Sequence, residues 1–162
     1  MDVQADTLSF EPIVFKDSKV LILGSFPSVQ SFKHNFYYAN PRNQFWKILS
    51  AVTEYPVNNR DQKIWLLKES RFALWDMIKS CNRKDSSDSN LEDEEVNDIA
   101  TLLEEYGSIE KIAFTGRKAE ALYHLHFEYL GLDTVYLPSP SSAYAKMSIN
   151  EKVAEYQDKF QL

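Results

Sequence analysis

The side chains of this sequence that suit chemistry are amides, hydroxyls and aromatic rings, gathered in two stretches. The first holds Gly24, Ser25, Phe26, Pro27, Tyr38 and Asn43, and the second holds Pro138, Ser139, Pro140, Ser141 and Ser142. A carboxamide such as that of Asn43 can hold a water molecule, and a ring such as that of Tyr38 can stack on a base. Backbone N–H groups in a sharp turn, such as those of Ser25 and Phe26, can receive negative charge. These residue types alone name no reaction.

Several kinds of site are disfavoured. A serine hydrolase would need a Gly-x-Ser-x-Gly elbow, which is missing, and neither His124 nor His126 is expected at a strand end. The four glycines form no Gly-x-Gly-x-x-Gly, which argues against a dinucleotide site. Cys81 is the only cysteine, and no Cys or His spacing fits zinc. We therefore expect neither a metal nor a cofactor.

The composition is that of one soluble domain covering residues 1–162, with 44% hydrophobic and 26% charged residues. We find no apolar run of the roughly 20 residues that span a bilayer and no signal peptide, so we expect a cytoplasmic protein without membrane contact. The net charge of −6 argues against non-specific nucleic-acid binding. Residues 16–47, however, carry five basic side chains against the single acid Asp17, so one positive face is possible.

Apolar runs that alternate with amphipathic segments predict the elements that must position these residues. The predicted strands are 19–24, 72–76, 109–116 and 134–138. One predicted helix starts at Asn40-Pro41, and the others cover 61–70, 92–106, 117–130 and 150–160. Residues 80–90 are predicted to form a loop. This alternation predicts a three-layer α/β/α fold with a central, mainly parallel, four-stranded sheet. In such sheets the site lies beyond the carboxyl ends of the strands. Asp76 and Thr115 stand at two of these ends, where they could line a pocket or simply end a strand.

Asn40-Pro41 is a strong helix-start signal, with Asn as N-cap and Pro at the first helical position. Asn43 would then lie at the third position of the helix, with its carboxamide at the mouth of the pocket. The alternative is that Asn43 merely caps its own helix. Position alone does not separate these two roles.

Three segments in this order resemble the uracil-DNA glycosylase superfamily, most closely its hypoxanthine (deoxyinosine) branch. They are Gly24-Ser-Phe-Pro27, Tyr38-Ala-Asn-Pro-Arg-Asn-Gln-Phe-Trp46 and Pro138-Ser-Pro-Ser-Ser-Ala143, and the segment from Leu74-Trp-Asp-Met to Ser86-Ser-Asp88 also matches the branch. The resemblance covers about residues 19–160. It implies a monofunctional, cofactor-free repair enzyme that flips a deaminated base from DNA and hydrolyses its glycosidic bond.

The resemblance also implies roles for individual residues. Asn43 would hold the water, and Tyr38 would stack on the flipped base. The base would also meet Gly24, Ser25, Phe26, Pro27 and Thr115, while damaged DNA would be gripped by Arg42, Ser139, Pro140, Ser141 and Ser142. We expect the enzyme to act as a monomer.

Two positions depart from the pattern of several relatives. Phe26 stands where they carry an Asp or Asn that activates the water, so Asn43 would take over and activity on uracil would be poor or missing. Ser139 is a weaker donor than the His or Asn of relatives. These departures leave open an alternative, a non-catalytic DNA- or nucleotide-binding module of the same fold.

Overall fold

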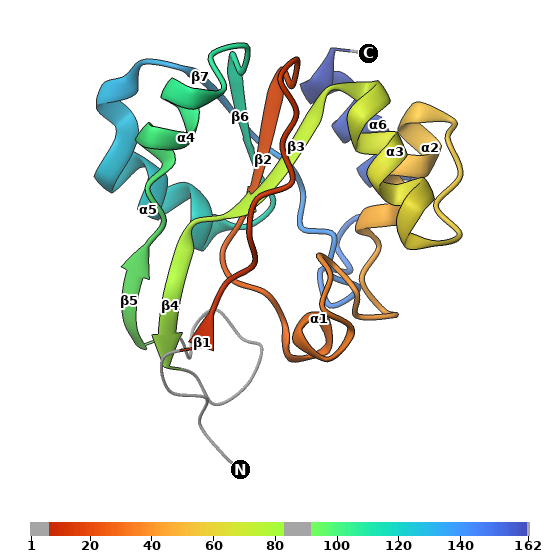
Figure 1. Ribbon diagram of the computed structural model, residues 1–162. Coiled ribbons are helices and arrows are strands. Elements are labelled where there is room, and N and C mark those ends of the chain that lie inside the picture. Colours follow the sequence, from red (N-terminus) through yellow and green to blue (C-terminus); the bar gives the residue numbers. More distant parts are fainter. Residues whose placement is uncertain (1–6, 83–91, 162) are drawn as a thin grey trace.

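Buried apolar segments build a central sheet of four parallel strands in the order β3-β2-β6-β7 (Figure 1). The computed structural model describes residues 7–82 and 92–161. The strands are β2 (Val20–Gly24), β3 (Phe72–Asp76), β6 (Lys111–Phe114) and β7 (Asp133–Tyr136). All four predicted strands are confirmed, as is the parallel sheet.

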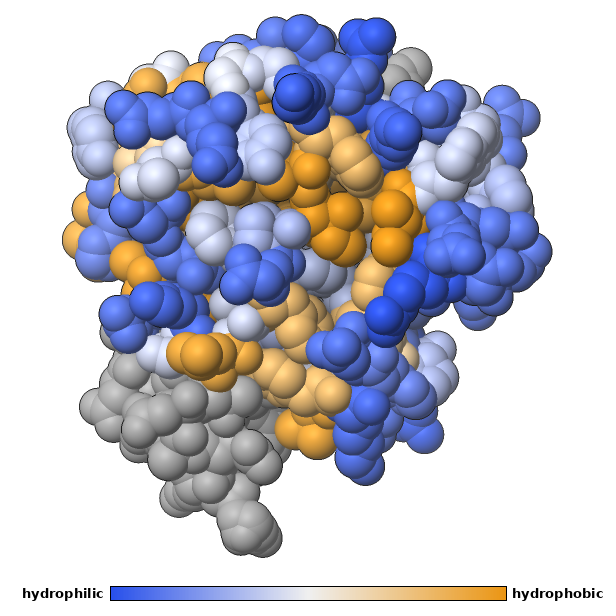
Figure 2. Space-filling model, viewed as in Figure 1, coloured by the Kyte–Doolittle hydropathy of each residue, from blue (hydrophilic) through white to orange (hydrophobic). Residues whose placement is uncertain are grey.

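Helices cover both faces of this sheet, because side chains alternate across each strand. Ile22 faces one core, against α2 (Phe45–Thr53), α3 (Arg60–Ser70) and α6 (Ile149–Phe160). Leu21 and Leu23 face the other core, against α4 (Ile99–Glu105) and α5 (Arg117–Phe127). The predicted three-layer fold is thus confirmed. Polar residues cover the side of the molecule where α2 and α3 lie (Figure 2). None of the described helices has the length and apolarity needed to cross a membrane.

The end of α5 also follows the sequence. A short 3-10 helix, Glu128–Leu130, continues from α5 and ends at Gly131, whose φ is +73°. Glycine adopts this left-handed conformation readily, so the helix predicted over 117–130 can end here.

A second, antiparallel sheet of β1 (Thr7–Leu8), β4 (Ile78–Asn82) and β5 (Glu92–Val96) was not predicted. The predicted helix over 92–106 is wrong in its first part, because residues 92–96 pair with β4 instead. Asp98 provides the actual helix start: its side chain accepts a hydrogen bond from Thr101 N at 3.0 Å. The predicted loop of residues 80–90 begins as strand, and its remainder, with Ser86-Ser-Asp88, lies outside the described residues.

Asn40-Pro41 forms a tight turn and does not start the helix. Arg42 N donates to Asn40 Oδ1 at 2.9 Å, and Asn43 N donates to Asn40 O at 2.9 Å. The helix α2 begins only at Phe45. Asn and Pro favour turns as strongly as helix starts, so the signal was ambiguous. Asn43 therefore precedes the helix and is not its third residue.

Candidate active site

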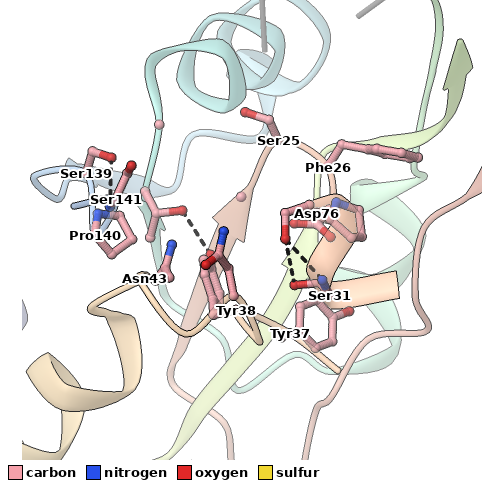
Figure 3. A pocket seen from close by; sticks show the side chains of 16 residues that line it. Ser25, Phe26, Ser31, Tyr37, Tyr38, Asn43, Asp76, Ser139, Pro140 and Ser141 are labelled. Carbon is pink, nitrogen blue, oxygen red and sulfur yellow. Dashed lines mark hydrogen bonds between the residues drawn. The ribbon is translucent and has the colours of Figure 1, made fainter. Parts of the chain in front are cut away.

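A cavity of about 370 Å³ opens at the carboxyl ends of β2, β3 and β6. The predicted residues that line it are Gly24, Ser25, Phe26, Pro27, Tyr38, Asn43, Thr115, Ser139, Pro140 and Ser141. They form two walls: the early wall, residues 24–43, and the late wall, residues 138–141. Figure 3 shows the late wall on the same side as Asn43, across from Phe26 and Asp76. The cavity thus lies at the edge of the sheet where a site is expected.

Gly24 lines the cavity at a point where a larger residue would crowd its neighbours. A Cβ atom added there would lie 2.7 Å from Asp76 Oδ1 and 3.0 Å from the Tyr38 hydroxyl oxygen. Asp76 is only 4% exposed and lines the cavity. The end of β2 thus brings backbone, a carboxylate and a phenol together at one point.

Tyr38 is fixed on both its ring and its hydroxyl. Its ring stacks on Phe45, with centroids 3.9 Å apart and planes 19° apart. Its hydroxyl oxygen lies 2.9 Å from Thr115 Oγ1, within hydrogen-bond distance. One ring face is covered by Phe45, so a base can stack only on the opposite face. These contacts orient the ring without a ligand.

Asn43 lies in the cavity lining, two residues before α2. Its Oδ1 accepts a hydrogen bond from Phe45 N at 2.9 Å, so the side chain does stabilise the start of the helix. A carbonyl oxygen has two lone pairs. The second lone pair and the amide N–H groups can therefore bind water while the first bond holds the side chain in place.

The late wall is held by hydrogen bonds from other parts of the chain. Gln44 N donates to Pro140 O at 2.7 Å, and the Tyr156 hydroxyl donates to Pro138 O at 2.8 Å. Ser141 N donates to Ser139 Oγ at 3.2 Å within the wall. These bonds place the serines beside Asn43.

The remaining predicted residues lie less centrally. Arg42 and Ser142 are exposed and do not line the cavity, although Arg42 stands between Asn40 and Asn43, which do. The Phe26 ring packs near Phe32, with centroids 5.6 Å apart, and points away from Tyr38 and Asn43 in Figure 3. Phe26 thus contributes its backbone to the cavity lining.

The sequence did not predict α1 (Val29–His34), whose start also lines the cavity. Ser28 caps this helix, with its Oγ accepting from Ser31 N at 3.1 Å. Ser31 in turn accepts from Ala39 N at 3.1 Å, which fixes the chain before Asn40. Ser28 after Pro27 is a favourable N-cap residue and could have signalled this helix.

Tyr37 was likewise missed as a lining residue. Its hydroxyl donates to Glu11 O at 2.7 Å. Burial, with a smaller contribution from the Asp76 charge, raises the pKa of Tyr37 well above its usual value. Tyr37 therefore stays neutral. Among the described residues, no three His, Cys, Asp or Glu side chains gather where they could hold a metal ion.

Comparisons with known proteins agree with this architecture. A hypoxanthine DNA glycosylase of Methanosarcina acetivorans is 35% identical over 145 residues, which cover 88% of this chain and 91% of that protein. One of Methanosarcina barkeri is 29% identical over 136 residues, covering 83% and 85%. A solution structure from M. acetivorans, of a candidate uracil DNA glycosylase, superposes with a TM-score of 0.83 at 33% identity, covering 99% of this chain and 98% of that one.

Residues 12–161 match the family model described as Uracil DNA glycosylase superfamily. This range contains both walls of the cavity and all four strands of the parallel sheet. The chain belongs to the uracil DNA glycosylase superfamily.

Proposed function

We propose that this chain is a monofunctional DNA glycosylase that flips a deaminated base, hypoxanthine first, and hydrolyses its N-glycosidic bond. The observation that carries the proposal is that Tyr38, Asn43 and the late wall line the same cavity. Curated relatives named hypoxanthine DNA glycosylase support the choice of base.

Asn43 is the proposed water holder. Glycosidic cleavage develops positive charge on the sugar and negative charge on the departing base. A water molecule held in position can therefore attack the sugar without a strong general base. The bond from Phe45 N fixes Asn43 Oδ1 before substrate arrives. Such preorganised groups lower a barrier because they need no reorientation during the reaction.

The base is proposed to stack on the ring face of Tyr38 that Phe45 leaves open, a contact worth about 1–3 kcal/mol. The turn after β2 places the backbone of Ser25 and Phe26 in the cavity lining. Their N–H groups are proposed to receive the negative charge of the base, with Gly24, Pro27 and Thr115 completing its pocket.

Damaged DNA is proposed to lie over the late wall, with Arg42 and Ser142 at its edge. Hydroxyl and amide groups there can bind phosphates without carrying charge. Because the chain has a net charge of −6, we expect weak binding that falls as salt rises. Affinity that hardly changes with salt contradicts this part of the proposal.

We propose that no cofactor, metal or covalent lysine intermediate takes part. A Schiff-base lysine needs an apolar pocket, whereas Lys33 and Lys47 are exposed and do not line the cavity. Borohydride should trap no protein–DNA adduct, and prolonged chelator treatment should leave the rate unchanged. A trapped adduct, or a rate restored only by divalent metal, contradicts this mechanism. We further propose that the protein is a cytoplasmic monomer. Sedimentation can test its oligomeric state.

The deciding experiment is single-turnover excision from duplexes that contain hypoxanthine, uracil or xanthine. We expect release of hypoxanthine and poor activity on uracil, because Phe26 leaves only Asn43 to hold the water. Binding without release of any of these bases would support the alternative, a non-catalytic DNA-binding module.

A further inference from the structure

Lys152 is a fully buried ammonium that the proposed mechanism does not use. It lies on α6, which packs along α2, and its side chain is 0% exposed. Its Nζ donates to Gln44 Oε1 at 2.7 Å and to Ser141 O at 3.1 Å. Lys152 thus joins the residue before α2 to the late wall.

The charge of Lys152 has no acidic partner within the part of the chain that the structure describes. Its acceptors there are a carboxamide and a backbone carbonyl, with the ring of Tyr144 5.5 Å from Nζ. Burial lowers the pKa of Lys152, because a charged group loses its hydration. Although the chain has a net charge of −6, no described acid forms an ion pair with Lys152.

The late wall contacts this charge directly. Lys152 Nζ donates to Ser141 O, and residues 139–141 line the cavity. Tyr156, one helical turn along α6, holds Pro138 in the same way. A charge held in a poorly hydrated place acts on nearby ions with little screening. An anion bound on the late wall would therefore be attracted by the charge of Lys152 without contacting the side chain.

We propose that Lys152 is a positioning residue whose buried charge, acting through the late wall, attracts a backbone phosphate of the substrate DNA. This inference rests on the proposed function. The phosphate supplies the negative charge that the described residues around Lys152 do not. The late wall offers only neutral donors, so Lys152 adds the electrostatic attraction that they do not provide.

The test removes the charge and follows how DNA binding depends on salt. Affinity for an undamaged duplex is measured between 50 and 200 mM salt for wild type, Lys152→Gln and Lys152→Met, beside Lys68→Gln as control. Lys68 is exposed near the end of α3, which leads into the amino end of β3, opposite the cavity. Both neutral replacements are expected to fold, since replacing a buried charge by a neutral group is often tolerated.

We expect each Lys152 variant to bind DNA roughly fivefold more weakly than wild type at 50 mM salt and with almost equal affinity at 200 mM. The slope of log affinity against log salt concentration should then become shallower by about one. Lys68→Gln should keep the wild-type slope. A purely structural Lys152 would weaken binding equally at both salts and lower the melting temperature, which overturns the proposal. An unchanged affinity, or failure of both neutral variants to fold, overturns it as well. Excision of hypoxanthine by wild type, measured in parallel, tests the proposed function separately.

Discussion

The two walls of the cavity are held in place by different kinds of contact. The early wall combines bonds between near neighbours, such as Ser28 with Ser31, with bonds to distant segments, such as Met77 N to Gly24 O and the Tyr37 hydroxyl to Glu11 O. The late wall is held by Gln44 of a distant turn and by Lys152 and Tyr156 of α6. The early wall therefore draws part of its support from its own residues, whereas the late wall depends mainly on the packing of α6. The proposed function needs both walls to face one another.

The largest expected effect is in the early wall, at Asn43. Asn43→Ala should slow single-turnover excision of hypoxanthine by roughly 10²–10³-fold, as for removing one preorganised group. Loss of its bond to Phe45 N should cost only about 1 kcal/mol of stability. Excision and thermal melting of the variant and of wild type provide the measurement.

Asn59→Ala is the matched control for this prediction. Asn59 also supports a helix start through its side chain: it is the N-cap of α3 and accepts from Gln62 N at 2.9 Å, whereas Asn43 precedes the first residue of α2 by two positions. Asn59 lies outside the cavity lining. It should lower stability by a similar amount and leave excision unchanged. An Asn43→Ala variant that melts lower yet excises at the wild-type rate would make Asn43 a cap alone.

The next largest effect is expected at Gly24. Gly24→Ala places a Cβ 2.7 Å from Asp76 Oδ1 and 3.0 Å from the Tyr38 hydroxyl, so the Asp76 or Tyr38 side chain, or the end of β2, must shift. Such overpacking costs about 1–3 kcal/mol, and the shift should reduce excision at least tenfold. Gly107→Ala is the control, because a Cβ there meets nothing within 4 Å. If Gly24→Ala has the melting temperature and excision rate of wild type, the neighbouring side chains can move aside without cost to the site.

The contrast between the walls explains what the sequence could predict. The parallel strands and the helical segment over 117–130 follow from local apolar runs, and both were predicted. The turn at Asn40-Pro41 was taken for a helix start, because one residue pair favours both structures. The β5 strand was missed because it forms only through its pairing with β4, and its acidic residues have low strand propensity.

The same limit applied to the site. Asn43, Tyr38 and the Ser/Pro segment were predicted together, because their residue types and order resemble a known family. Lys152 was not, since a lysine in an amphipathic helix ordinarily lies at the surface. Only the packing of α6 along α2 buries it beneath Ser141.

A smaller effect is expected from the support of the late wall. Tyr156→Phe removes the hydroxyl that donates to Pro138 O and leaves a buried carbonyl without that bond, at a cost of about 1–2 kcal/mol. The melting temperature should fall by roughly 2–4 °C per kcal/mol. We also expect weaker DNA binding, because the late wall loses an anchor.

Tyr123→Phe provides the comparison for Tyr156→Phe. The Tyr123 hydroxyl is buried and has no hydrogen-bond partner among the described residues. Removing it should leave stability unchanged or raised, and should not affect DNA binding. Equal destabilisation by the two substitutions would show that the bond to Pro138 contributes nothing particular to the late wall.

The smallest expected effect concerns the bond that ties the early wall to the sheet. The Tyr38 hydroxyl lies 2.9 Å from Thr115 Oγ1, 77 residues away along the chain. A double-mutant cycle with Tyr38→Phe and Thr115→Val should give a coupling of roughly 0.5–1.5 kcal/mol in the free energy of unfolding. Tyr38→Phe keeps the ring that stacks on Phe45, so excision should fall by less than about tenfold, far less than for Asn43→Ala. Zero coupling would mean that the hydrogen bond to Thr115 does not help to orient Tyr38. Coupling together with a large loss of excision would instead mean that the hydroxyl, and not only the ring, acts on the base.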